Sequence, residues 1–191
     1  MHHDPFIHFQ NWYAEAQASE PSDPDAACLA TVDTAGLPNA RVVLIRKIDA
    51  RGFCFFTNLE SQKGQELLST PKAALNFHWK TLKRQVRVRG MIDLCTPDES
   101  DAYYASRPLG NRIGAWASLQ SRTLLDRQVL VDRVAEFVTK FNDHPTRPDH
   151  WGGFRLTPLS IEFWKEGEFR LHDRTRFDKM GDNWNVTKLY P

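Results

Sequence analysis

Three basic residues stand at alternate positions near the end of the chain, in Arg170-Leu-His172-Asp-Arg174. If this segment is the second strand of a hairpin, its side chains alternate between two faces and the three basic groups share one of them. Such a row repels itself unless an anion, a carboxylate or water lies against it, which makes it a candidate cradle for a phosphorylated ligand. A solvated hairpin face that only protects a sheet edge is the alternative.

Two further arginines bracket the apolar segment Arg41-Val-Val-Leu-Ile-Arg46. In a continuous strand, positions 41 and 46 have opposite parity, so their side chains point to opposite faces of the sheet. Unless a bulge interrupts the strand, the two guanidiniums cannot bind the same small anion. We therefore expect the two arginines to serve different ligands.

Several polar side chains have both a structural and a ligand-binding interpretation. Ser61 is expected to cap a helix whose free N–H groups, with Lys63, would favour phosphate, although any capped helix offers the same groups. Gln85, Arg87 and Arg89 share one face of a predicted strand, which we interpret as solvated for the two arginines. Tyr103, Arg107 and Asn111 recur at intervals of four, but Pro108 interrupts the helix that would align them. Gln120 and Ser121 could cap a helix or bind a ligand, and Trp164 could be core or a wall against a flat ring.

Composition excludes several classes of protein. The 191 residues are 41% hydrophobic, enough for one domain (1–191) that folds without a disulfide or metal. A net charge of +1 argues against a general nucleic-acid binder. Cys28, Cys54 and Cys95 stand singly, so we expect buried free thiols, no metal site and a reducing cytoplasm. No apolar run approaches the roughly 20 residues of a membrane helix, and no signal peptide is visible.

Hydrophobic periodicity predicts a mainly β chain with flanking helices, in which two groups of strands are separated by a helical insertion over about 96–142. This pattern is typical of a closed or split β-barrel. The stripe Leu130, Val134, Phe137, Val138 and Phe141 is expected to belong to the core. The predicted helices are 4–18, 61–68, 96–105, 111–117 and 124–141. The predicted strands are 28–32, 39–48, 53–57, 73–79 and 84–94, and then, within 152–189, the segments 153–157, 160–165, 169–178 and 184–189.

The sequence lacks the motifs of several common chemistries. It has no Gly-x-Ser-x-Gly elbow, no Walker loop, no Gly-x-Gly-x-x-Gly after a strand and no carboxylate pair in an apolar setting. Its scattered cations with aromatic neighbours suit an anionic organic cofactor that brings its own reactivity.

A series of short motifs runs in order along the chain: Ala30-Thr-Val-Asp33, Arg41-Val-Val-Leu44, Phe56-Thr-Asn58, Ser61-Gln-Lys63, Arg84-Gln-Val86, Ser106-Arg-Pro108, Ile113-Gly-Ala-Trp-Ala-Ser118, Gln120-Ser121, Trp151-Gly-Gly-Phe154, Ile161-Glu-Phe-Trp164 and Arg170-Leu-His-Asp-Arg174. In this order, the series resembles the pyridoxine (pyridoxamine) 5'-phosphate oxidase family of FMN-dependent enzymes. The resemblance implies a split β-barrel homodimer with FMN bound across the subunit interface and each subunit contributing to both sites.

The resemblance also implies a set of FMN contacts. Arg41 and Lys63 would be the partners of the FMN phosphate, and Gln85 with the Gln120-Ser121 pair would bind flavin edges or ribityl hydroxyls. The full set would be Arg41, Val42, Val43, Leu44, Ile45, Arg46, Phe56, Thr57, Gln62, Lys63, Gln85, Gln120, Ser121, Trp164 and Arg174.

For the substrate, the resemblance implies phosphate contacts from Arg46, Tyr103, Arg107 and Asn111. The catalytic pair Arg170 and His172 would orient the pyridine ring and tune its protonation. The implied reaction moves a hydride from C4' of pyridoxamine or pyridoxine phosphate to flavin N5, giving pyridoxal phosphate, and O2 then reoxidises the flavin with release of H2O2.

Two positions depart from the family pattern. Arg46 stands where the family usually has Lys, and Asn111 stands where Ser is expected, so the shape of the phosphate site changes while its charge is kept. Longer members also carry an N-terminal arm that helps to cover the substrate. A related split-barrel FMN oxidoreductase with another anionic substrate is therefore an alternative. A non-catalytic protein that binds flavin or pyridoxal phosphate is another.

Overall fold

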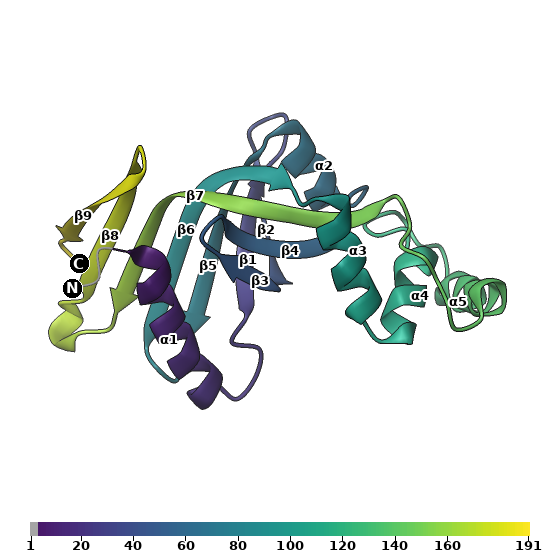
Figure 1. The fold of residues 1–191 in the computed structure, drawn as a ribbon, viewed down its shortest axis with the longest axis horizontal. Helices are drawn as coiled ribbons and strands as arrows, with labels where there is room; N and C mark the ends of the chain where they lie inside the picture. The colour runs from purple at the N-terminus through teal and green to yellow at the C-terminus, as the bar shows by residue number, and fades with distance from the viewer. Residues whose placement is uncertain (1–3) are drawn as a thin grey trace.

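The computed structural model describes residues 4–191 (Figure 1). An antiparallel sheet curls into a half-barrel, in the order β2-β1-β5-β6-β7-β4-β3, with β8 pairing to β7 and β9 to β8. The predicted split-barrel fold class with flanking helices is confirmed. The strands are β1 (Ala26–Val32), β2 (Pro38–Leu44), β3 (Lys47–Asp49), β4 (Gly52–Asn58), β5 (Lys72–Trp79), β6 (Arg84–Leu94), β7 (Trp151–Lys165), β8 (Asp173–Met180) and β9 (Asn183–Leu189).

The long strand β7 joins the two parts of the sheet. Its first part pairs with β4, its last part pairs with β8, and β6 runs along its other side. The sequence predicted two strands here, divided at Pro158, and this division is wrong. Pro158 instead lies at a bulge opposite Gly90, where the register shifts by one residue. Gly90 is needed at this point because a Cβ there would lie 2.0 Å from the Thr157 carbonyl oxygen.

Helix α1 (Pro5–Ser19) packs on the curled sheet. It begins as predicted, with the Asp4 side chain accepting a hydrogen bond from the Phe6 N–H and Pro5 in the first turn. Phe9 is fully buried, and its ring centroid lies 5.0 Å from that of Phe53 and 5.0 Å from that of Phe77. The apolar face of α1 therefore completes the main core.

The remaining helices are α2 (Gln62–Ser69), α3 (Pro97–Ser106), α4 (Leu109–Ala117) and α5 (Arg127–Phe141). The predicted capping box of Thr96 and Glu99 opens α3. Helices α4 and α5 form a small second core, at the opposite end of the molecule from β8 and β9 (Figure 1). In α5, Phe137 is buried, but Val134 and Val138 are exposed, so the prediction that the whole stripe is core is wrong.

The chain between β7 and β8 differs most from the prediction. The expected strand 169–178 begins only at Asp173, because residues Glu168–Arg170 form the 3-10 turn η1. Phe169 and Arg170 have φ angles of 54° and 65°, a left-handed backbone that ends any alternation of faces. The chain folds so closely over Gly167 that a Cβ there would lie 2.1 Å from the Leu171 carbonyl oxygen.

The expected row of Arg170, His172 and Arg174 on one strand face is therefore wrong. Only Arg174 belongs to β8, and the other two lie in the preceding turn and its exit. The three cysteines are free, and Cys54 and Cys95 are buried as expected, whereas Cys28 is half-buried. Among residues 4–191, no helix is both long and apolar enough to cross a membrane.

Candidate active site

The first group of predicted ligand-binding residues surrounds the ammonium of Lys63. Ser61 caps α2 as predicted, and Lys63 Nζ donates to Thr57 Oγ1 at 3.1 Å, to Ser61 Oγ at 3.2 Å and to Gln120 Oε1 at 3.1 Å. Within residues 4–191, no carboxylate lies within 4.0 Å of this ammonium. Burial lowers the pKa of Lys63, and the charge of Arg41 lowers it further. The Lys63 ammonium is therefore a cation whose hydrogen bonds all go to neutral oxygen atoms.

Arg41 lies in β2 beside this group and already has an anionic partner. Its Nη2 lies 3.0 Å from Glu66 Oε2, and its Nη1 donates to the Thr31 hydroxyl. The Glu66 side chain is only 6% exposed and also accepts a hydrogen bond from Asn39 Nδ2 at 3.0 Å. Burial alone would raise the pKa of Glu66, but hydrogen bonds from Thr31, Asn39 and Arg41 lower it, so the side chain is a carboxylate.

Phe56 in β4 separates two cavities. Its ring stacks on Tyr103 with a centroid distance of 4.2 Å and on Trp151 with one of 5.7 Å. One cavity of about 300 Å³ includes Thr57, Arg107, Asn111 and Gln120 in its wall, and the other, of about 390 Å³, includes Arg46, Cys54, Cys95, Glu99 and Tyr103. The four predicted substrate-phosphate residues thus line adjoining cavities on the two sides of Phe56.

Arg107 contributes a second cation without a carboxylate partner among residues 4–191. It ends α3, and its guanidinium lies 4.8 Å from the centre of the Trp151 ring. Its Nη1 is buried and has no hydrogen-bond partner in this part of the chain. Burial lowers the pKa of Arg107, although an arginine remains charged near neutral pH. A buried donor of this kind is stabilised when an anion enters the cavity beside it.

The second group of predicted residues lies across β6, β7 and β8. Gln85 is paired with Trp164, and Trp164 with Arg174, in the strand register. The His172 ring lies 4.7 Å from the Trp164 ring, and the Gly167 N–H donates to His172 Nδ1 at 3.2 Å. A neutral His172 therefore carries its proton on Nε2. Arg170, in η1, is exposed next to this group.

Arg174 is fixed by a buried carboxylate that the sequence reasoning did not assign. Its Nε and Nη2 donate to Glu162 Oε1 at 3.0 Å and 2.8 Å. The other carboxylate oxygen accepts from Arg87 Nη2 at 2.5 Å. Glu66 was missed in the same way, as was Asp25, which lies 2.7 Å from Arg46. No sequence signal marks these acids, because each pairs with an arginine at least 12 residues away.

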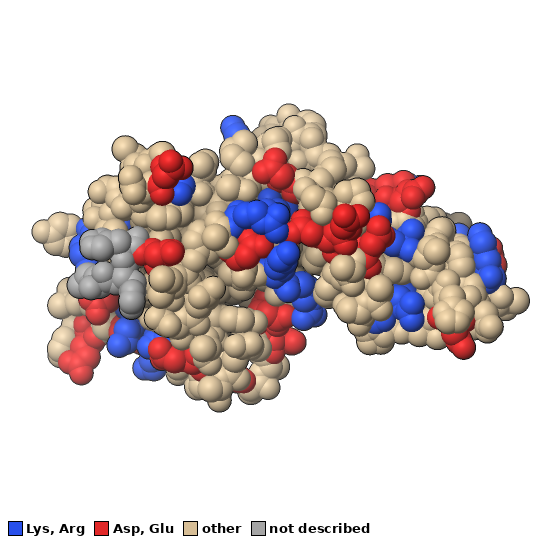
Figure 2. Space-filling model, viewed as in Figure 1, with Lys and Arg blue, Asp and Glu red and all other residues tan. Residues whose placement is uncertain are grey.

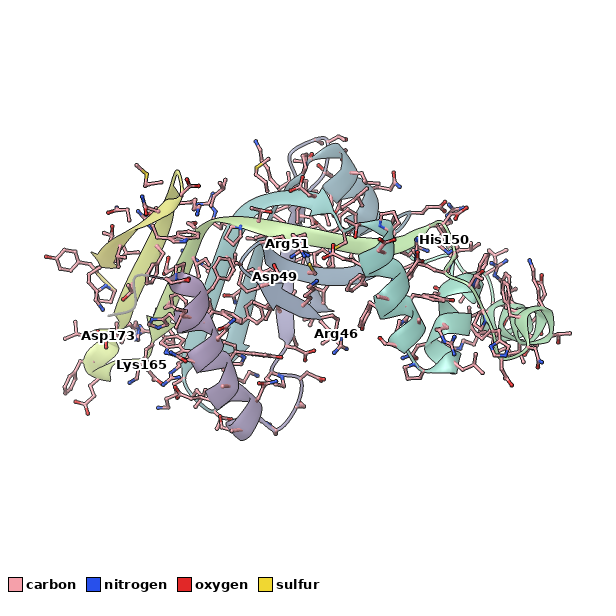
Figure 3. All side chains as sticks on the ribbon, viewed as in Figure 1. Arg46, Asp49, Arg51, His150, Lys165 and Asp173 are labelled. Atoms are coloured by element: carbon pink, nitrogen blue, oxygen red, sulfur yellow. The ribbon has the colours of Figure 1, made fainter. Side chains whose placement is uncertain are left out.

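The two groups lie apart within one chain. In Figure 3, Lys165 and Asp173, which flank the second group, lie at one end of the molecule, whereas Arg46 lies toward the helical end. The remaining predicted FMN contacts are spread along β2, the start of α2 and the loops: the Val42 side chain is 67% exposed, Ile45 is buried, Val43 and Leu44 are half-buried, and Gln62 and Ser121 are exposed.

Two family models match this chain. One, described as pyridoxamine 5'-phosphate oxidase, covers residues 14–141. The chain belongs to the pyridoxamine 5'-phosphate oxidase family. The second match, described as the pyridoxine 5'-phosphate oxidase C-terminal dimerisation region, covers residues 151–191 and so includes the second group of residues.

Relatives of this oxidase family match nearly the whole chain. A pyridoxine/pyridoxamine 5'-phosphate oxidase from Allorhizobium ampelinum is 54% identical, over 99% of this chain and 93% of that protein. The one from Brucella anthropi is 56% identical, over 98% of this chain and 94% of that protein. The predicted family and its assignment as an oxidoreductase are therefore confirmed.

Two solved structures have the same fold. PhzG from Burkholderia lata, solved in complex with tetrahydrophenazine-1-carboxylic acid, has a TM-score of 0.94 and 32% identity, covering 99% of this chain and 93% of that one. An FMN-binding protein from Nostoc punctiforme, related to pyridoxamine 5'-phosphate oxidase, has a TM-score of 0.78 and 15% identity, with full coverage of both chains. The second likeness shows the fold alone.

Proposed function

We propose that this protein oxidises pyridoxamine 5'-phosphate or pyridoxine 5'-phosphate to pyridoxal 5'-phosphate, with FMN as cofactor and O2 as electron acceptor. For the amine, pyridoxamine phosphate, O2 and water give pyridoxal phosphate, ammonia and H2O2. The observation that carries this proposal is a pair of cations beside aromatic-walled cavities, Lys63 and Arg107, that have no carboxylate partner within the described residues 4–191. Two such cations suit two phosphate groups, one on the cofactor and one on the substrate.

The residues around Lys63 fit the phosphate end of FMN. The ammonium is partly desolvated, has no carboxylate within ion-pair distance among residues 4–191, and is held by hydroxyl and amide oxygens that leave its charge uncancelled. Arg41, fixed by Glu66, would add a second donor, and Thr57 and Gln120 would bind polar edges. When bound, FMN supplies the acceptor for a hydride.

Arg107, Tyr103, Asn111 and Arg46 would hold the substrate phosphate. They border the adjoining cavities around Phe56, and the unpaired Arg107 Nη1 would donate to a phosphate oxygen. At the other end of the substrate, Arg170 would orient the pyridine ring. His172, with Nδ1 occupied by the Gly167 N–H, would present its Nε2 proton to the ring.

A second copy of the chain would complete each site. In one chain, α2 with Lys63 and the end of α3 with Arg107 lie apart from the end of β7 with Trp164 and the chain just before β8 with His172 (Figure 1). The two groups of one chain therefore cannot enclose the same ligand. The match of residues 151–191 to a C-terminal dimerisation region supports a homodimer in which the second group faces the first group of the partner. In such a dimer FMN would lie at the interface.

The decisive experiment is an assay of purified protein reconstituted with FMN. We expect pyridoxamine phosphate to yield pyridoxal phosphate and H2O2 in equal amounts, and we expect the flavin absorbance to bleach on adding substrate without air and to recover with O2. Flavin binding without bleaching by either phosphorylated vitamer would contradict the proposal and favour a non-catalytic flavin-binding protein.

A related oxidase with another anionic substrate is the second candidate. The observation that favours it is the ion pair between Arg46 and Asp25, which removes net charge from the predicted phosphate site. PhzG from Burkholderia lata, at 32% identity, was solved with a carboxylic acid. Parallel assays with the phosphorylated vitamers and with tetrahydrophenazine-1-carboxylic acid separate the two candidates. The first candidate function predicts turnover of the phosphorylated vitamers alone.

A further inference from the structure

Asp25 forms an ion pair with Arg46, one of the residues predicted to bind the substrate phosphate. Arg46 Nη1 donates to Asp25 Oδ2 at 2.7 Å, and the Asp25 side chain is only 14% exposed. The main chain fixes this arrangement, because the Ile45 N–H donates to the Asp25 carbonyl at 2.9 Å and the Arg46 N–H to the Cys54 carbonyl at 2.8 Å. The backbone that carries both side chains is thus held in place independently of the ion pair.

Arg46 lies between two cavities. It borders the one that contains Tyr103 and a smaller one of about 190 Å³ beneath α1, which contains Tyr13. Burial raises the pKa of the Tyr13 hydroxyl, the Asp25 carboxylate raises it further, and the charge of Arg46 lowers it. Arg46 is also within electrostatic reach of Arg107, whose pKa is lowered mainly by burial and further by this second guanidinium. The positive charge of Arg46 therefore acts on the same region of the molecule as the other residues predicted to bind the substrate phosphate.

The contact with Asp25 uses only one of the hydrogen-bonding groups of Arg46. A guanidinium carries five N–H donors in a planar fork, and in the structure only Nη1 is bonded to the carboxylate. The other edge of the fork remains available to an anion. A lysine has one compact ammonium, which would be drawn to Asp25 as a point charge.

We propose that Asp25 is a positioning residue for substrate recognition: it holds one edge of Arg46, directs the other edge to the substrate phosphate, and makes arginine necessary at position 46. This inference rests on the proposed function. Because Asp25 and Arg46 act as one unit, the effects of substitutions at the two positions on the binding free energy should not add.

The test uses three variants, Arg46→Lys, Asp25→Asn and the double variant, as FMN-loaded protein. The ligands are 4-deoxypyridoxine 5'-phosphate and 4-deoxypyridoxine, which have no oxidisable group at C4', and binding is measured by equilibrium dialysis. The ratio of the two dissociation constants isolates the phosphate contribution. Glu15→Gln on α1, which breaks the 2.8 Å ion pair of Glu15 with Arg84 of β6, is the matched control and should leave the ratio unchanged.

For Arg46→Lys, we expect the phosphate contribution to fall at least about tenfold, because Asp25 captures the ammonium. The double variant should recover to within about threefold of the wild type, because the lysine is then released. In turnover, the same pattern should appear in KM, with kcat changed much less.

Two results would overturn the inference: a double variant as weak as Arg46→Lys, or an Arg46→Lys variant that binds phosphate as well as the wild type does. Failure of the proposed function looks different. In that case the wild type would show no preference for the phosphorylated ligand and no turnover of the phosphorylated vitamers.

Discussion

The cations predicted to bind ligands are of two kinds. Three arginines carry a carboxylate partner, which fixes the side chain and cancels its charge, whereas three cations have none among residues 4–191. The first kind orients hydrogen-bond donors, and the second supplies net charge for an anionic ligand. The paired set is Arg41 with Glu66, Arg46 with Asp25 and Arg174 with Glu162, and the unpaired set is Lys63, Arg107 and the exposed Arg170.

Replacing Lys63 by methionine should stabilise the ligand-free protein and weaken FMN binding. The lowered pKa of Lys63 means that the folded state binds the proton less tightly than the unfolded chain, so the charge costs stability below the lowered pKa and not above the usual 10.5. Lys63→Met removes this cost at neutral pH but also removes the phosphate partner. Thermal unfolding and fluorescence titration with FMN measure the two effects.

The exposed Lys72→Met is the control for this experiment and should change neither quantity. A Lys63→Met protein that is less stable without FMN, or that binds FMN as the wild type does, would contradict the interpretation of Lys63 as a desolvated cation kept for an anion.

Alternation of side chains predicted some of these residues well and failed at others. The bounds of β6 and the caps of α2 and α3 agree with the sequence, because alternation and capping are local. The grouping of Arg170 with His172 and Arg174 failed because two residues with left-handed backbone, Phe169 and Arg170, replace the expected strand. The acids that hold the arginines are brought in by tertiary pairing, which no local pattern encodes.

Among the elements, α3 is attached to the sheet by charge. Glu99 in its first turn accepts from Arg155 Nη2 at 2.8 Å, from Arg51 Nη2 at 2.6 Å and from Lys47 Nζ at 3.1 Å. Asp49 accepts from Arg155 Nη1 at 2.9 Å. Figure 2 shows acidic and basic atoms interleaved across this part of the surface. This network fixes the helix that carries Tyr103 and ends at Arg107.

Replacing Glu99 by glutamine should therefore destabilise the protein in a pH-dependent way. Burial would raise the pKa of Glu99, but hydrogen bonds from Arg51, Lys47 and the Thr96 N–H, with the charge of Arg155, lower it to about 2. Its stabilisation is complete above the usual 4.5 and is lost as the pH falls toward 2. Urea unfolding should show Glu99→Gln about 1–3 kcal/mol less stable at pH 7, with the difference shrinking below pH 4.5.

Asp98→Asn changes the neighbouring acid of the same helix turn, which is exposed and lies outside the network, and should alter stability little at either pH. If Glu99→Gln and Asp98→Asn behaved alike, the network would not be what attaches α3.

The bulge between β6 and β7 makes a second prediction about an element. Gly90→Ala would place a Cβ 2.0 Å from the Thr157 carbonyl oxygen, a backbone atom that cannot move without opening the strand pair. We expect a loss of at least about 2 kcal/mol in urea unfolding, or failure to fold. Gly114→Ala, within α4 and with no atom within 4 Å of the new Cβ, should instead stabilise by about 0.5–1 kcal/mol. Equal effects of the two substitutions would argue against strain at the bulge.

At the scale of the whole molecule, a site built from one group of each subunit predicts that two inactive variants restore activity when they form a mixed dimer. Arg107→Ala damages the first group and His172→Ala the second, so each variant alone should be inactive. In a mixed dimer, one site carries both substitutions and the other carries neither. Random mixing by unfolding and refolding together should therefore restore about a quarter of the wild-type activity, since half of the dimers are mixed and each has one intact site of two.

As a control, mixing two variants of the same group, Arg107→Ala with Asn111→Ala, should restore no activity, because every site would still carry a substitution in that group. Activity in this control, or its absence in the first mixture, would contradict a site shared between copies.

Strand β7 sets the distance and the relative orientation of the two groups of residues. It begins at Trp151, against the Phe56 wall, and reaches Trp164 in the other group, so the spacing and the facing of the two groups are set along one backbone. Leu159, the extra residue of the bulge, shifts the parity between these ends. Removing it would turn Trp164 to the opposite face while leaving each group internally intact. A side chain at either end can therefore be substituted without changing this register, but a change in the length of the strand would place the predicted cofactor and substrate residues out of phase.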